Sequence, residues 1–144
     1  MKIAVFSDTH GNTARMLEAV RALKPDALIH LGDFEKDTEP LRREFPDIPL
    51  YSVCGNCDFY PKAPSGAVVE LGGVKAFLTH GHLYNVDWST DSLVYAAQEA
   101  GCRIAMYGHT HIVDYLIGPP LVLNPGSASR PRDDQRGSFI VMEL

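Results

Sequence analysis

Aspartate, asparagine and histidine side chains follow five short apolar runs of this sequence. Each run has the composition of a buried strand, and the first polar residue comes within three positions of its end. The residues concerned are Asp8, His10, Asp33, Asn56, His80, His109 and His111. Ligands gather at the carboxyl ends of strands in α/β sheets, so these side chains should converge on one crevice if the strands share a sheet.

The side chains offer a mixed set of oxygen and nitrogen donors. Such a set suits Mn²⁺, Fe²⁺, Zn²⁺ or Co²⁺. Asp8 and His10 are two residues apart, as are His109 and His111. Residues two apart in an extended chain point the same way, so each pair is expected to chelate one ion.

Glycine precedes three of these residues, at Gly32, Gly55 and Gly108, where it would let the backbone turn sharply into the site. A single Asp after a strand is usually a turn or cap residue, and a single His is usually structural. Five of the six histidines nevertheless lie in these strand-end segments, which favours a metal site. The sixth, His30, lies inside a predicted strand and is interpreted as structural.

The apolar pattern predicts an α/β domain with either one mixed sheet or two packed sheets. Gly72-Gly73 predicts a hairpin, and Asn12 is a candidate helix cap. Strands are expected at residues 2–7, 27–31, 49–53, 67–71, 74–79, 103–107, 112–117, 121–123 and 137–143, and helices at 13–23, 38–45 and 87–100. A single domain is expected to span residues 1–144.

Composition narrows the function classes. The 144 residues carry a formal net charge of −5 and no basic run, which argues against an extended nucleic-acid surface. No apolar run reaches the roughly 18–20 residues that span a bilayer, and no signal peptide is evident. We expect a cytoplasmic protein that does not bind membranes, and its oligomeric state, including a homo-oligomer, stays open.

The segments around these residues resemble the motifs of the calcineurin-like metallophosphoesterases, in family order. They are Asp8-Thr9-His10, Gly32-Asp33, Gly55-Asn56-Cys57-Asp58, Thr79-His80-Gly81-His82 and Gly108-His109-Thr110-His111. Asn124-Pro125-Gly126-Ser127 resembles a segment of the small prokaryotic phosphodiesterase branch. The resemblance implies an α/β fold that is a four-layer αββα sandwich of two mixed sheets flanked by helices.

The resemblance also implies two divalent cations, with Mn²⁺ expected first and Fe²⁺, Zn²⁺, Co²⁺ or Ni²⁺ as alternatives. One cation would take Asp8, His10, Asp33 and His111; the other would take Asp33, Asn56, His80 and His109. A hydroxide bridging the metals would hydrolyse a small phosphate ester, and a diester is the expected substrate. Asp33, Asn56 and His82 are the residues expected to act on the substrate.

Cys57 departs from the phosphomonoesterase pattern, in which a His follows the Asn. A neutral thiol is a weak hydrogen-bond donor and brings no positive charge, which favours diesters over monoesters. Asp58 is expected either to orient His80 or another ligand, or only to form a turn. Specificity is expected in the loops at residues 34–39, 59–65, 84–89 and 127–136.

Three alternatives remain open. Cys54-Gly55-Asn56-Cys57 could be a redox or zinc motif, although no helix follows it and no second cysteine pair exists. The same fold could instead carry a phosphomonoesterase. It could also serve as a binding scaffold, as in a retromer subunit, although a scaffold has no need of a complete ligand set.

Overall fold

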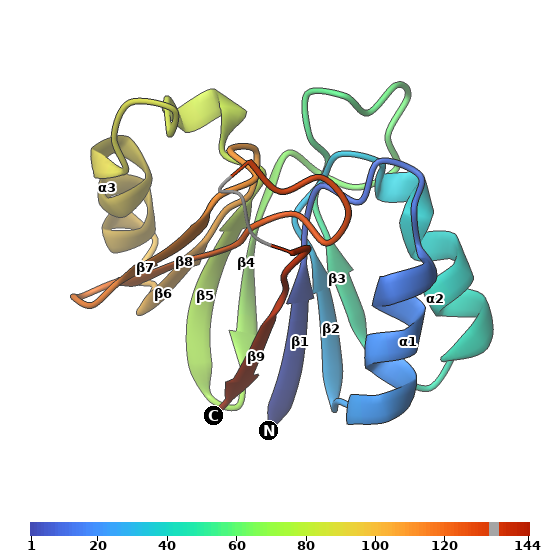
Figure 1. The fold of residues 1–144 in the computed structure, drawn as a ribbon. Coiled ribbons are helices and arrows are strands. Elements are labelled where there is room, and N and C mark those ends of the chain that lie inside the picture. Colours follow the sequence, from blue (N-terminus) through green and yellow to red (C-terminus); the bar gives the residue numbers. More distant parts are fainter. Residues whose placement is uncertain (133–135) are drawn as a thin grey trace.

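The computed structural model describes residues 1–132 and 136–144, and its strands form two sheets (Figure 1). The first sheet has the order β3 (Leu50–Ser52), β2 (Ala27–His30), β1 (Lys2–Phe6), β9 (Ile140–Glu143). The second has the order β4 (Gly66–Leu71), β5 (Val74–Thr79), β6 (Ile104–Met106), β8 (Leu121–Pro125), β7 (Val113–Leu116). Each sheet mixes parallel and antiparallel pairs.

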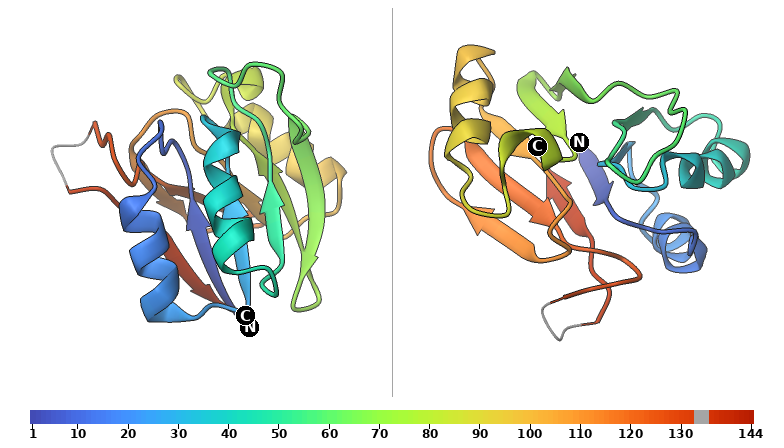
Figure 2. Two further views of the ribbon diagram at one scale, coloured as in Figure 1. Left: turned by 90° about the vertical axis from the view of Figure 1, so that its right-hand side faces the viewer. Right: turned by 90° about the horizontal axis from the view of Figure 1, so that it is seen from above.

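Helices cover the outer faces of both sheets. Helices α1 (Ala14–Leu23) and α2 (Thr38–Glu44) pack on the first sheet, where Met16 and Leu41 meet Phe6. Helix α3 (Asp91–Glu99) packs on the second sheet through Leu93 and Ala97. The view from above in Figure 2 shows α3 on one side of the sheets and α1 and α2 on the other. The expected αββα order of layers is therefore present.

The main core lies between the sheets. Strand β1 shows why its sequence is apolar throughout: Ile3 and Val5 face the second sheet, whereas Ala4 and Phe6 face the helices. A strand that is buried on both faces has no polar alternation. The burial of these strands fixes their carboxyl ends, and hence the loops that carry the polar residues.

Several predicted boundaries were wrong. The helix predicted at 87–100 begins at Asp91, because residues 85–89 form a turn in which the N–H groups of Trp88 and Ser89 donate to the Asn85 carbonyl. The strand predicted at 137–143 pairs only from Ile140, since Ser138 binds the Ser127 and Pro125 carbonyls instead. Short 3₁₀ turns at Glu35–Asp37 and His82–Tyr84 were not predicted.

The five strands that precede the polar segments do not share one sheet. Strands β1, β2 and β3 belong to the first sheet, and β5 and β6 to the second. Their carboxyl ends nevertheless point to the same end of the molecule, opposite the two chain termini (Figure 1). Within residues 1–132 and 136–144, no helix has the length and apolar character to cross a membrane.

Candidate metal centre

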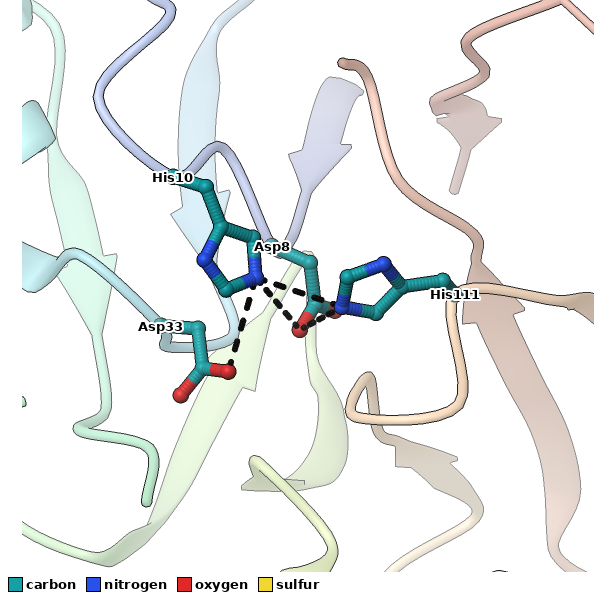
Figure 3. Close-up of side chains that lie close together, drawn as sticks. All are labelled: Asp8, His10, Asp33 and His111. Atoms are coloured by element: carbon teal, nitrogen blue, oxygen red, sulfur yellow. Dashed lines mark hydrogen bonds and ion pairs between the residues drawn. The ribbon is translucent and has the colours of Figure 1, made fainter. Parts of the chain in front are cut away.

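Four side chains from three loops form a compact cluster at this end of the molecule. Asp8, His10, Asp33 and His111 each offer a ligand atom, and these atoms all lie within 4.8 Å of one another. Figure 3 shows the four side chains directed toward one another. His111 Nε2 lies 3.2 Å from Asp8 Oδ1, and His10 Nε2 lies 3.6 Å from Asp33 Oδ2. These donors could hold a divalent cation.

The backbone at these residues is not extended, contrary to the prediction that alternation along an extended chain aligns each pair of side chains. Asp8, His10, Asp33, His109 and His111 all have φ between 47° and 70°, in the left-handed region. Asp8 and His10 still converge, but His109 points away from His111 toward another part of the site. Non-glycine residues in this conformation cost about 1–2 kcal/mol each, and such strain is typical of functional sites.

His80 and His111 are oriented as metal ligands usually are. The Nδ1–H group of His80 donates to the Leu31 carbonyl at 2.7 Å, and that of His111 donates to the Arg130 carbonyl at 2.7 Å. Each neutral ring then directs the Nε2 lone pair at Asp8 Oδ1, 3.8 Å and 3.2 Å away respectively. Two lone pairs that face each other require a proton or a cation between them.

Buried polar atoms at the centre have no hydrogen-bond partner among the described residues: Asp8 Oδ1, His80 Nε2 and His82 Nδ1. An unsatisfied buried polar atom is costly, so a native fold rarely keeps one without a purpose. The Asp8 and His80 atoms face the interior of the cluster. This arrangement fits a cation that the protein binds there.

Asp33 lies between two groups of predicted ligands. Its Oδ2 faces His10, whereas its Oδ1 lies 3.3 Å from His80 Nε2 and accepts the Cys57 N–H at 2.9 Å. Burial alone would raise the pKa of Asp33, but the interaction with His80 and the Cys57 N–H lower it well below its usual value. The carboxylate is therefore ionised at neutral pH and can contact ions on both sides.

His109 lies in a second group of predicted ligands, with Asn56 and His80. Its Nδ1 lies 3.0 Å from Asn56 Oδ1, and its ring centroid lies 5.2 Å from that of His80. Its Nε2 lies 2.9 Å from Asp87 Oδ2. In the neutral ring only one nitrogen carries a proton. If Asp87 accepts the hydrogen bond from that N–H group, Nδ1 presents a lone pair beside Asn56 Oδ1, and these two atoms could bind a second cation.

The remaining predicted site residues surround this second group. The His82 ring centroid lies 5.5 Å from that of His80, and burial lowers the pKa of His82. Cys57 lies beside Asn56, whose Nδ2 is 3.6 Å from its sulfur. Burial and the carboxylates of Asp33 and Asp58 raise the pKa of the Cys57 thiol, the opposite of what a redox-active thiolate requires.

Asp58 does not orient His80, because the Leu31 carbonyl does so. The two oxygens of Asp58 accept the N–H groups of Glu35 and Gly55, both at 2.7 Å. This carboxylate thus forms the turn that carries Asn56 and ties it to the loop after Asp33.

The glycines beside the ligands serve different purposes. Gly32 has φ of 96°, as the expected sharp turn requires. Gly55 and Gly108 do not have positive φ, but a Cβ at Gly55 would lie 2.2 Å from Asp33 Oδ1, and one at Gly108 would lie 2.0 Å from Ser7 Oγ. At these two positions glycine is required by close packing, not by conformational freedom.

Sequence reasoning missed the residues that fasten the ligand loops. Thr9 Oγ1 donates to Asp37 at 2.7 Å and contacts His30 Nε2, while His30 Nδ1 accepts the Gly32 N–H. This network occupies both nitrogens of His30, and burial lowers the His30 pKa to about 4. His30 thus lies outside the cluster of ligands. No spacing in the sequence pairs Thr9 with Asp37.

The segment at residues 124–129 fastens the other side. Ser127 Oγ donates to the Asp8 carbonyl at 2.8 Å, and Ser129 Oγ donates to the Thr9 carbonyl at 2.7 Å. Asn124 Nδ2 donates to the Gly108 carbonyl at 3.0 Å. The resemblance included residues 124–127, but it did not predict that they hold the ligand loops in place. Of the predicted specificity loop 127–136, residues 133–135 lie outside the described part of the chain.

Known proteins resemble this chain over its whole length. A model described as the calcineurin-like phosphoesterase superfamily domain matches residues 1–144. A probable metallophosphoesterase of Bacillus subtilis (strain 168) is 30% identical over 148 residues, covering 100% of this chain and 85% of that protein. The crystal structure of a predicted phosphoesterase from Streptococcus pneumoniae TIGR4 has a TM-score of 0.82 and 36% identity, covering 99% of this chain and 83% of that one.

A relative of a different kind is vacuolar protein sorting-associated protein 29 of Schizosaccharomyces pombe. It is 30% identical over 161 residues, and the match covers 100% of this chain and 85% of that protein. The relatives that match this whole chain therefore include a protein named as a probable metallophosphoesterase and a protein named for vacuolar protein sorting.

Proposed function

Because the chain belongs to the calcineurin-like phosphoesterase superfamily, we propose that it is a metal-dependent phosphodiesterase that acts on a small phosphate ester. The observation that carries the proposal is the cluster of Asp8, His10, Asp33 and His111, whose ligand atoms all lie within 4.8 Å of one another and in which the buried Asp8 Oδ1 has no hydrogen-bond partner among the described residues. Hydrolase families of this type bind divalent cations, and the donor set here suits Mn²⁺ first, with Fe²⁺, Zn²⁺, Co²⁺ or Ni²⁺ as alternatives.

We assign the ligands to two positions. Asp8, His10, Asp33 and His111 would hold one cation, and Asp33, Asn56, His80 and His109 the other. Asp33 supports this division because Oδ2 faces His10 while Oδ1 faces His80. When bound, divalent cations here would neutralise phosphate charge and lower the pKa of a water molecule toward neutrality.

The protein's own groups position the reactants. Asn56 is exposed at the second position, so its amide can contact a phosphoryl oxygen as well as a cation. His82 lies beside His80 and His109, where its ring can donate to the phosphate. Together with Asp33, these residues would hold the ester phosphorus in line for attack by water.

The ester class follows from the residue after Asn56. Cys57 offers a neutral thiol whose pKa is raised by burial and by Asp33, so it neither donates strongly nor carries charge. A monoester dianion gains most from a cationic donor at this position, whereas a diester with a good leaving group depends on it less. The diester is therefore the favoured substrate.

The test measures hydrolysis of bis(p-nitrophenyl) phosphate after exhaustive chelation and after addition of single metals, with bound metal quantified in each sample. Activity should disappear on chelation and return most fully with Mn²⁺. The matching monoester, p-nitrophenyl phosphate, should react more slowly per bound metal. Full activity with metal content near zero would overturn the proposal.

A sorting or scaffold function is the second candidate, and the Schizosaccharomyces pombe relative is the observation that favours it. It predicts that neither ester is hydrolysed by protein that carries two bound metals per chain. The same experiment thus separates the two candidates.

A further inference from the structure

We propose that a pocket beside the metal centre binds the nucleotidyl group of a phosphodiester substrate, a proposal that rests on the function proposed above. This side pocket lies between α2 and the loop after β3 and has a volume of about 520 Å³. Its walls include aromatic, cationic and thiol side chains: Phe34, Lys36, Arg42, Cys57, Phe59, Tyr60 and Lys62.

The side pocket shares residues with the metal centre. The N–H group of Cys57 donates to Asp33, and the Phe34 ring centroid lies 5.1 Å from that of His10. Both Cys57 and Phe34 also line the side pocket. The side pocket and the metal centre are therefore adjacent. A group attached to a phosphate bound at the centre can extend directly into the side pocket.

Two neighbouring aromatic rings on the pocket wall are exposed. Phe59 is 88% exposed and Tyr60 is 99% exposed. Neither ring contributes to the core. A single exposed apolar residue is common on protein surfaces, whereas adjacent large exposed rings beside a site indicate a binding surface. Planar bases stack on such rings in many nucleic-acid and nucleotide sites. The rings thus select a planar heterocycle.

The cations of the side pocket are available to a ligand. Lys36, Arg42 and Lys62 are exposed, and none forms an ion pair with a carboxylate of the described residues. Lys36 Nζ lies 5.2 Å from the Phe34 ring centroid, close to the centre. Cations that no carboxylate pairs with can turn toward an anionic group in the pocket.

The carboxylates of the same wall are largely engaged. Both oxygens of Asp58 accept backbone N–H groups, and Glu35 Oε2 accepts the Lys62 N–H at 3.4 Å. Glu39 is the remaining carboxylate that lines the pocket. The pocket lining therefore carries three carboxylates and three cations, but Asp58 and Glu35 are held by backbone N–H groups, whereas no carboxylate of the described residues holds the cations, which can turn toward a ligand. A group that combines a planar base with a second phosphate fits this chemistry best.

Three diesters with the same leaving group test the proposal: methyl p-nitrophenyl phosphate, the p-nitrophenyl ester of thymidine 5′-monophosphate, and that ester with a 3′-phosphate. In each, water forms a new P–O bond, the bond to the aryl oxygen breaks, p-nitrophenolate leaves and the proton passes to solvent. With Mn²⁺-loaded protein, kcat/KM should rise about tenfold with the nucleoside. It should rise again about tenfold with the 3′-phosphate.

Variants identify the source of any preference. Phe59→Ala with Tyr60→Ala should reduce the ratio of thymidine to methyl ester, and Lys36→Ser with Lys62→Ser should reduce the ratio of phosphorylated to unphosphorylated thymidine ester. Tyr95→Ala and Lys75→Ser, exposed residues on α3 and at the start of β5, serve as controls that should leave both ratios unchanged.

The outcomes separate this proposal from the proposed function. Equal kcat/KM for all three diesters would overturn the side-pocket proposal and leave the phosphodiesterase intact. A preference that survives in both double variants would also overturn it. Absence of hydrolysis of every diester by metal-loaded protein would overturn the proposed function, and with it this substrate assignment.

Discussion

At the scale of single residues, backbone carbonyls fix the tautomers of two histidines in the candidate centre. The Nδ1–H group of His80 donates a hydrogen bond to the Leu31 carbonyl, and that of His111 donates one to the Arg130 carbonyl. In each neutral ring Nε2 therefore carries the lone pair. A main-chain carbonyl cannot change its protonation state. The two rings are therefore set for a cation before one binds, which lowers the cost of ordering the site.

Asp33 is the residue that both metal positions would share. Asp33→Asn removes the negative charge that faces His10 and His80, so turnover should fall at least about tenfold further than in His111→Ala, which alters one position. Elemental analysis should show less bound metal in both variants. An Asp33→Asn protein with two metals and normal turnover would exclude the bridging assignment.

Asp87 is expected to set the tautomer of His109. Asp87→Asn should weaken metal binding at the second position by about 10–100-fold, measured by calorimetry, because Nδ1 is then no longer reserved for the cation. Long-range ¹H–¹⁵N spectra of the metal-free protein should show the His109 proton shift from Nε2. Asp47→Asn, an exposed substitution, is the control. An unchanged spectrum and affinity would show that Asp87 only lies near His109.

Cys57 is expected to set the preference for diesters. Cys57→His should raise monoester activity relative to diester activity, and a well-placed general acid is worth about 10²–10⁴-fold. The gain should be at the low end, because both oxygens of Asp58 are already bound to backbone N–H groups and cannot orient the new ring. Both rates are compared at equal metal content. A wild type that prefers the monoester, with no change in the variant, would contradict this role.

At the scale of elements, close packing of loops holds the ligands in place. Gly108 lies so near Ser7 and Asp8 that a Cβ would reach within 2.0 Å of Ser7 Oγ and 2.7 Å of Asp8 Oδ2. Ser7 in turn donates to Asp8 at 2.6 Å, and the His109 N–H donates to the same oxygen at 3.0 Å. The loops after β1 and β6 are therefore one packed unit.

Gly108→Ala should separate these two loops. We expect a loss of about 1–3 kcal/mol in the free energy of unfolding, typical of overpacking, together with weaker metal binding. Gly66→Ala is the matched control, because its Cβ would meet a Leu78 carbonyl at 3.5 Å, an ordinary contact. Urea unfolding and metal titration of both variants make the comparison. Equal effects of the two substitutions would show that packing at Gly108 does not support the centre.

How far the sequence predicts this architecture depends on the range of each interaction. Strands such as β1 and the hairpin at Gly72-Gly73 were predicted because their signals are local. The places of Asp8 and His111 after strands predicted their meeting only if those strands shared one sheet, which they do not, and the resemblance alone assigned both to one cation. The left-handed conformation of Asp8 and His109 was not predicted, because contacts far along the chain, such as Ser127 with the Asp8 carbonyl, impose it.

At the scale of the whole molecule, the pH dependence of stability reflects two sets of histidines whose pKa values shift in opposite directions. The interaction with Asp8 raises the pKa of His111, and the carboxylates of Asp33 and Asp8 outweigh burial to raise that of His80. Their contribution to stability is complete below pH 6.5, the ordinary histidine pKa, and is lost as pH rises through the raised values.

Burial lowers the pKa of three further histidines, His10, His30 and His82. For His10, His30 and His82, stability is complete above pH 6.5 and is lost as pH falls toward their lowered values, about 4 for His30. Asp8 and Asp33, whose pKa values lie below 3.8, lose their contribution only at still lower pH. One set of histidines therefore lowers the stability as pH rises above 6.5, and the other lowers it as pH falls below 6.5.

The metal-free protein should accordingly be most stable near pH 6.5, with a decline on the alkaline side that bound metal abolishes. A cation replaces the protons at His80 and His111, so metal-loaded protein should hold its stability as pH rises from 6.5 to 8.5. The measurement is urea unfolding from pH 5 to 8.5, with chelator or with Mn²⁺. His111→Asn should flatten the alkaline decline of the metal-free protein, since one of the two raised groups is gone. Chelated protein that keeps gaining stability above pH 6.5 would show that the lone pairs of these histidines do not face the carboxylates in solution.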